Sequence, residues 1–171
     1  NKVLTAIDTK VLSSSKDLLS QYEQWVTEEN YEGMVVRSSS GRVFKIKPSF
    51  SIDAVIIGYT ERSEDAAQIR SVALALMNEN GTYQFIGSCG NIGSDKDRKA
   101  LMKTIKKNQV DSSWRVTSNS GAMYRFVKPT IVVEIKFTDL QSEDSEGNSI
   151  EKMNLNFDQL GWSAAGKSFS A

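Results

Sequence analysis

The chain alternates between short apolar runs and polar stretches, which predicts a mixed protein of helices and strands. In residues 15–29 the apolar positions fall at helical spacing, with Ser15 as a candidate N-cap and Trp25 on the apolar side. Residues 1–12 contain short β-branched runs that predict one or two strands. The first part of the chain is therefore expected to combine a helix with strands.

The second half predicts several short strands with one helix among them. A dense apolar run at residues 54–57 indicates a buried strand, and Asn80-Gly81 favours a tight hairpin turn between two further strands. Residues 131–137 alternate between apolar and polar, as in a strand with one buried face. This order is typical of a five-stranded barrel of the OB type, with a small sandwich as the alternative.

Composition places the chain among ordinary globular proteins. Of its 171 residues, 39% are hydrophobic and 25% charged, and Lys+Arg and Asp+Glu both total 21, so any basic surface must be local. A single cysteine, Cys89, excludes an internal disulfide, and the lack of histidine excludes Ser-His and Cys-His catalytic pairs. Without a membrane-length apolar run or a signal peptide, we expect an intracellular protein, in the cytoplasm, nucleoid or nucleus.

Residues 32–48, EGMVVRSSSGRVFKIKP, predict a hairpin that begins with an acidic residue and has two lysines near its end. If its strands pair around a loop of even length, Glu32 lies opposite Lys47 and Met34 opposite Lys45, so that one carboxylate and two ammonium groups share a face. The pattern alone leaves two interpretations. One is a solvated surface with a cross-strand ion pair; the other is a site whose lysines bind a phosphate and whose carboxylate holds a divalent metal.

Several of these segments together resemble the ATP-dependent DNA ligases of the covalent nucleotidyltransferase superfamily. Residues 32–37 (EGMVVR) resemble the E-G motif of that family, and residues 45–47 (KIK) resemble its K-x-K motif. DAVIIGY, SCGNIGS before a basic helix, and KPTIVVEIKF then follow in the order found in ligase OB domains, so that the resemblance spans about residues 30–137. It implies an α+β chain: the C-terminal part of a nucleotidyltransferase (adenylation) domain at residues 1–62, followed by an OB-fold β-barrel at residues 63–171.

The resemblance also implies roles for the hairpin residues. Glu32 would help bind the catalytic Mg²⁺ or Mn²⁺, and Lys45 and Lys47 would contact the α-phosphate of ATP and stabilise the charge that develops there. In the family, a lysine of a K-x-D-G motif attacks ATP to form a lysyl-AMP. The AMP then passes to the 5′-phosphate of nicked or broken DNA, and a 3′-hydroxyl displaces it.

The chain departs from the family in two respects. It contains no K-x-D-G motif, and the basic motif that closes the family's OB domain is not found before the final GKSFSA. Since the sequence also begins at Asn1 rather than Met, we expect a piece of a longer protein. We expect this piece to need the upstream half of the adenylation domain, and to form no enzyme–AMP adduct alone.

A second candidate site is the basic helix expected at residues 95–107, which carries six Lys or Arg residues against two Asp. The resemblance favours contacts with the DNA backbone, whereas a helix with lysines on its outer face is otherwise simply solvated. The candidate nucleic-acid contacts are Lys96, Arg98, Lys99 and Lys103.

Three other functions stay open. RNA ligases and mRNA-capping guanylyltransferases share the E-G and K-x-K motifs, although KPTIVVEIKF favours a DNA ligase. A different class is a non-catalytic OB-fold module that binds single-stranded nucleic acid through exposed aromatic residues. Trp114, beside Arg115 in a polar stretch, is the aromatic residue to inspect for such stacking.

Overall fold

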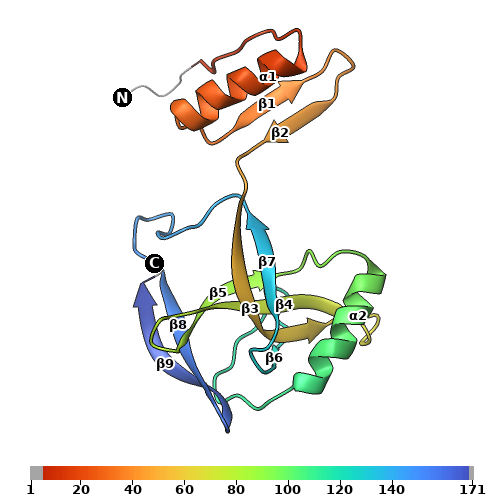
Figure 1. The fold of residues 1–171 in the computed structure, drawn as a ribbon, viewed down its shortest axis with the longest axis vertical. Helices are drawn as coiled ribbons and strands as arrows, with labels where there is room; N and C mark the ends of the chain where they lie inside the picture. Colours follow the sequence, from red (N-terminus) through yellow and green to blue (C-terminus); the bar gives the residue numbers. More distant parts are fainter. Residues whose placement is uncertain (1–5, 170–171) are drawn as a thin grey trace. The chain divides into compact units, whose positions relative to one another are not determined.

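The computed structural model describes residues 6–169, and the chain forms two compact units, Asn1–Phe50 and Ser51–Ala171. Figure 1 shows the elements of each unit. The sequence places a boundary after residue 62, but the units divide upstream of it. The reason is that the long strand β3 (Phe50–Glu61) pairs with strands of the second unit along most of its length.

The first unit contains one helical segment and one hairpin. The helix α1 (Ser15–Tyr22) continues as a π-helix, η1 (Glu23–Glu28), which confirms the helix expected at residues 15–29. Its N-cap is Ser14, whose hydroxyl accepts a hydrogen bond from the backbone N–H of Asp17 at 3.1 Å. Residues 6–12 form no strand, contrary to expectation, and residues 1–5 lie outside the described part of the chain.

The hairpin of β1 (Met34–Arg37) and β2 (Val43–Ile46) exists, but its predicted register is wrong by one residue. Met34 pairs with Ile46. The loop is closed by Ser38 and Arg42, whose backbone N–H and C=O lie 2.9 Å apart, so three residues separate the closing pair. Gly41 adopts φ +81°, the left-handed conformation that ends a three-residue hairpin loop. The odd loop length moves one strand by one residue relative to the even-loop pairing.

The second unit is built on an antiparallel sheet. It is formed by β3, β4 (Ile69–Met77), β5 (Tyr83–Cys89), β6 (Arg125–Phe126), β7 (Val132–Phe137), β8 (Glu151–Asp158) and β9 (Gly161–Phe169). The strand order is β6-β3-β4-β5-β8-β9, and β7 pairs with β3. The helix α2 (Asp95–Ile105) follows β5 and continues as a 3₁₀ turn, η2 (Lys106–Asn108). As Figure 1 shows, the strands curl into the barrel-like arrangement of an OB fold, as expected.

Apolar residues cover both faces of the central strands. Successive residues of β4 alternate between two clusters, with Leu74 in one and Ala75 in the other. The first cluster receives Met102 and Ile105 from α2, so that the helix covers that face. The second receives Trp162 from β9, whose indole N–H donates a hydrogen bond to the Val127 carbonyl at 2.8 Å. Both faces of β4 are therefore buried, and α2 packs on one of them through Met102 and Ile105.

The hairpin of β8 and β9 is not among the elements that the sequence predicted, since the last strand expected was that at residues 131–137. The signal was present in MNLNF, where Met153, Leu155 and Phe157 alternate with asparagines. Of these, Leu155 is fully buried. The strands β8 and β9 pair along their whole length, and β8 continues the sheet beyond β5.

Candidate functional site

The hairpin of the first unit brings two of the three expected charged residues into contact. The Lys47 ammonium donates a hydrogen bond to the Glu32 carboxylate, forming an ion pair in which both side chains are largely solvent-exposed. Lys45 belongs to β2 and is exposed, and Lys47 is the first residue after that strand.

Gly33 explains how Glu32 and Lys47 meet despite the shifted register. Because Met34 pairs with Ile46, Gly33 lies beside Lys47 at the base of the hairpin. A Cβ atom on Gly33 would collide with the Ile46 carbonyl oxygen and would come within 3.0 Å of the Lys47 side chain. The lack of a side chain at Gly33 thus allows the close backbone approach, and the Lys47 side chain reaches past Gly33 to Glu32.

The ion pair keeps Glu32 charged. The hydrogen bond from Lys47 and its positive charge hold the pKa of the Glu32 carboxyl below its ordinary value. No hydrogen bond or ion pair links Lys45 to Glu32 in residues 6–169. Of the three charges expected on one face, two are therefore in contact.

The hairpin carries a carboxylate that could serve as a metal ligand. Glu32 offers an ionised carboxylate, and Mg²⁺ is commonly bound by one or two carboxylates together with substrate phosphates. Over residues 6–169, no group of three or more acidic or cysteine side chains converges as a ready-made cage for a metal. A metal at Glu32 would thus depend on phosphate oxygens for much of its coordination.

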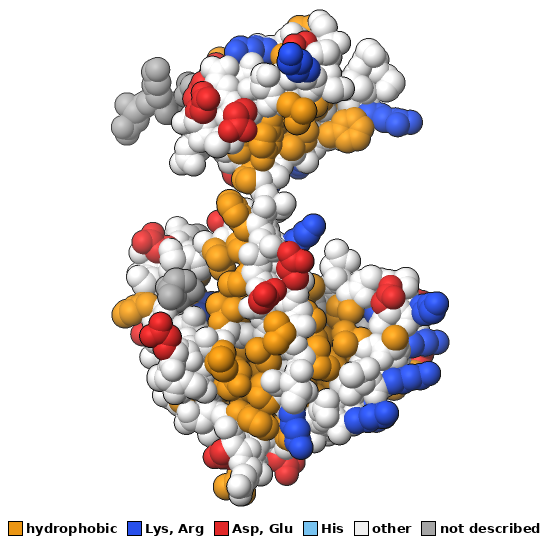
Figure 2. Space-filling model, viewed as in Figure 1, with side chains coloured by type: hydrophobic (Ala, Val, Ile, Leu, Met, Phe, Trp, Pro, Cys, Tyr) orange, Lys and Arg blue, Asp and Glu red, His pale blue; other side chains and the backbone are white. Residues whose placement is uncertain are grey.

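The helix α2 carries a basic outer face. Ser94 and Asp97 form a reciprocal capping box at its start, with the Ser94 backbone N–H donating to the Asp97 carboxylate at 2.9 Å. Lys96, Lys99 and Lys103 are exposed and fall at helical spacing on the side away from the core. Figure 2 shows a row of basic side chains at this edge of the second unit. Lys99 also pairs with Asp65 at 3.2 Å.

Arg98 differs from the three lysines with which sequence reasoning grouped it. Its side chain is buried, and its guanidinium donates hydrogen bonds to the carbonyls of Ile69 at 2.9 Å, Arg70 at 3.2 Å and Gly90 at 2.7 Å. It therefore fastens α2 to β4 and to the segment after β5. The sequence predicted Arg98 as a nucleic-acid contact together with the lysines, whereas in the structure position 98 lies on the same buried side as Met102 and Ile105.

Trp114 is part of the core packing rather than an exposed platform. Its ring makes edge contacts with Phe85 and Phe126, at centroid distances of 5.3 Å and 5.7 Å. These contacts leave Trp114 half-buried, so it does not offer the open aromatic face that base stacking needs.

A second cationic group was missed by the sequence analysis. Arg62, Arg70 and Arg98 line one pocket of about 400 Å³ in the second unit. They come from the end of β3, the start of β4 and α2, and no shared motif links them. Only the folded sheet brings them together.

Comparison with known proteins gives one family match. Residues 65–157 match the family described as "ATP dependent DNA ligase C terminal region". No curated protein matches the chain significantly.

Solved structures resemble the chain in fold. The ligase domain from M. tuberculosis LigD is 18% identical with a TM-score of 0.49, and the alignment covers 87% of this chain and 48% of that domain. Two structures, Pmar-Lig_Pre and Pmar-Lig_PreS3, are each 14% identical with a TM-score of 0.50, covering 91% of this chain and 30% of theirs. The chain thus spans less than half the length of these relatives. Neither α-helix of residues 6–169 has the length and apolar character of a membrane span.

Proposed function

The chain belongs to the family of ATP-dependent DNA ligase C-terminal regions, and we propose that the whole protein seals breaks in DNA. It would join a 3′-hydroxyl to a 5′-phosphate at a nick or break through enzyme–AMP and DNA–adenylate intermediates, with ATP and a divalent metal. The observation that carries this proposal is the family match over residues 65–157, which covers more than half of the 171 residues.

The hairpin contributes one wall of the nucleotide site in this proposal. Lys45 and Lys47 bind the α-phosphate, and Glu32 supplies one ligand to Mg²⁺ or Mn²⁺. Their charges support these roles, since the ammonium groups attract phosphate and the Glu32 carboxyl, whose pKa is lowered by Lys47, is ionised near neutral pH. When bound, ATP supplies the AMP group and the metal neutralises phosphate charge.

The nucleophile comes from outside residues 1–171. No K-x-D-G motif occurs in this sequence, so the lysine that attacks ATP belongs to an upstream half of the adenylation domain. The first unit, Asn1–Phe50, would supply the C-terminal part of that domain. The chain alone is therefore expected to form no covalent adduct with AMP.

The outer face of α2 contributes to DNA binding in this proposal. Lys96, Lys99 and Lys103 contact backbone phosphates, and Arg98 holds the helix in position from its buried side. The family match favours a DNA ligase over an RNA ligase or a capping enzyme. The half-buried position of Trp114 argues against a simple single-strand-binding module.

The test is adenylation of the full-length protein. Incubated with α-labelled ATP and Mg²⁺, it should form a covalent AMP adduct that is lost in Lys45→Ala and Lys47→Ala. The matched control Arg42→Ala removes an exposed cation from the hairpin loop and should retain the adduct. An adduct with labelled GTP instead would indicate a capping enzyme, and no adduct with either nucleotide would overturn the proposal.

A further inference from the structure

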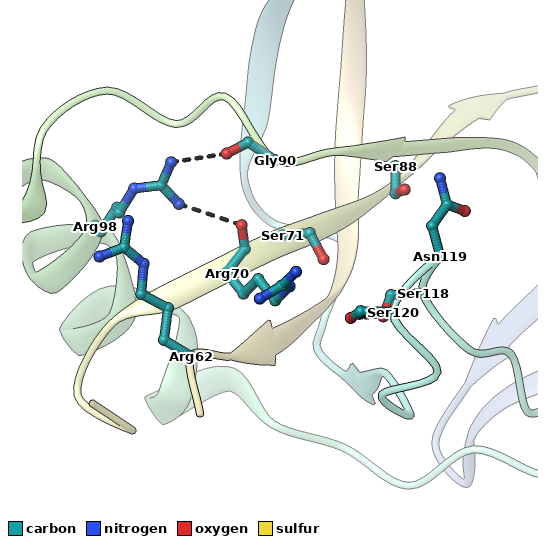
Figure 3. Close-up of a pocket in the computed structure, with 9 residues that line it drawn as sticks. All are labelled: Arg62, Arg70, Ser71, Ser88, Gly90, Arg98, Ser118, Asn119 and Ser120. Carbon is teal, nitrogen blue, oxygen red and sulfur yellow. Dashed lines mark hydrogen bonds between the residues drawn. The ribbon is translucent and has the colours of Figure 1, made fainter. Parts of the chain in front are cut away.

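A pocket within the second unit is lined by three arginines and by no acidic residue. It has a volume of about 400 Å³ and is shown in Figure 3. Its lining consists of Arg62, Arg70, Ser71, Ser88, Gly90, Arg98, Ser118, Asn119 and Ser120. Arg62 forms an ion pair with Asp95, which lies outside the lining, so the charges of Arg70 and Arg98 are the ones that no carboxylate offsets in residues 6–169.

Arg98 provides a fixed positive charge at one side of the pocket. Its guanidinium is held by three backbone carbonyls, two of which are marked in Figure 3. Carbonyl groups satisfy its N–H donors but carry no net charge, and none of the ion pairs within residues 6–169 includes Arg98. A buried charge without a counter-ion is costly, so this position favours an anion nearby.

Arg62 and Arg70 also line the pocket, and they differ in their partners. Nη1 of Arg62 donates to Gln68 at 3.0 Å and forms an ion pair with Asp95 at 3.1 Å, which orients the guanidinium and partly offsets its charge. Arg70 is exposed, and no hydrogen bond or ion pair in the described chain engages its side chain. Arg70 can therefore turn toward a ligand without first breaking a contact.

The opposite wall carries neutral donors. Figure 3 shows Ser88 and Asn119 close together on the side away from Arg62 and Arg98, with Ser118 and Ser120 below them. The hydroxyls of Ser118 and Ser120 lie 3.0 Å apart. Hydroxyl and amide donors opposite guanidinium groups match the several acceptor oxygens of a phosphate, whereas a carboxylate has only two oxygens to offer.

We propose that this pocket binds a phosphate group, through Arg70 and Arg62 on one side and Asn119 with the serine hydroxyls on the other. The phosphate can be a free phosphate-class anion or a phosphodiester of a nucleic acid. The pocket lies entirely within Ser51–Ala171, so the free-anion form does not depend on the ligase reaction. The phosphodiester form rests on the proposed function.

The first arm of the test is an NMR titration of the 171-residue chain with inorganic phosphate, at constant ionic strength set with chloride. Backbone amides of Ser88, Asn119 and Ser120 should shift in a saturable manner. Arg70→Ala should weaken binding roughly tenfold, because a charge-assisted hydrogen bond contributes more than a neutral one. Asn119→Ala, which changes no charge, should weaken it about threefold. Lys136→Ala removes an exposed cation elsewhere on the unit and serves as the control.

The second arm measures binding of nicked duplex DNA to the same variants. If Arg70→Ala weakens DNA binding more than Lys136→Ala does, and phosphate competes, the ligand is a phosphodiester. If phosphate binds in the pocket while DNA affinity is unchanged in Arg70→Ala, the ligand is a free anion. The proposal is overturned if neither probe shows a dependence on Arg70, or if Arg70→Ala and Lys136→Ala lose equal affinity. A negative adenylation assay leaves the inorganic-phosphate arm intact.

Discussion

Lys47 donates a hydrogen bond to Glu32, although the hairpin register places Gly33, and not Glu32, beside Lys47. With a loop of even length the two residues would lie directly opposite each other, whereas in the observed register their contact is diagonal. A Cβ atom on Gly33 would collide with the Ile46 carbonyl oxygen, so the close approach of the strands at this point depends on the missing side chain at position 33.

The lowered pKa of Glu32 should rise toward its ordinary value in Lys47→Gln, because Lys47 supplies both its hydrogen bond and the nearby positive charge. A carboxyl with a depressed pKa contributes stability above the ordinary carboxyl range and loses it as pH falls through the lowered pKa. A carboxyl-detected NMR titration measures this directly. Lys45→Gln is the control and should leave the pKa of Glu32 where it is; an equal rise in both variants would contradict the specific contact.

Gly33→Ala should destabilise the β1–β2 hairpin by about 1–3 kcal/mol, since the new Cβ collides with a backbone carbonyl that cannot move alone. Hydrogen exchange of the amides of Val36 and Phe44 reports the loss of protection, because hydrogen-bonded and non-hydrogen-bonded pairs alternate from the Ser38–Arg42 pair onward. Gly41→Asn is the matched control, because its φ of +81° suits asparagine and nothing lies within 4 Å. Unchanged exchange in Gly33→Ala would show that the close approach is dispensable.

Arg98→Met should destabilise the second unit by about 3 kcal/mol, because three carbonyls lose their donors in a buried setting. Urea denaturation followed by tryptophan fluorescence gives the free energy of unfolding. Lys103→Met, on the exposed side of the same helix, should change it by only about 0.5 kcal/mol. Equal effects would mean that Arg98 is not the anchor of α2.

The proposed DNA contacts predict a specific change in salt dependence. Lys96→Gln and Lys103→Gln should each lower the slope of log affinity against log salt concentration by about one, since each removes one phosphate contact. Lys99→Gln should have a smaller effect, because Asp65 already pairs with Lys99. Lys136→Gln should leave the slope unchanged. Fluorescence anisotropy with nicked DNA at several salt concentrations measures all four variants.

Local patterns predicted most of the fold. The helix at residues 15–29, the Asn80-Gly81 turn and the alternating strand at residues 131–137 all appear, because each is set by residues close in sequence. The register of the first hairpin was missed because it depends on loop length. A Ser-Ser-Ser-Gly sequence does not reveal whether two or three residues separate the closing pair.

The pocket lined by Arg62, Arg70 and Arg98 could not be predicted from the sequence. In the sequence, Arg98 is one of several cations on a basic helix. Only the folded structure shows that its guanidinium donates to the backbone carbonyls of residues 69, 70 and 90. Arg62 and Arg70 stand in polar or strand segments and share no motif with Arg98. Their common pocket arises from the pairing of β3, β4 and β5, which single-sequence patterns do not specify.

The contacts of Arg98 also bear on the order of folding. Its acceptors belong to the start of β4 and to Gly90 after β5, and they come together only when those two strands have paired. We therefore expect the β4–β5 hairpin to form before α2 docks, with Arg98 contributing late. In kinetic terms, its replacement should speed unfolding far more than it slows refolding.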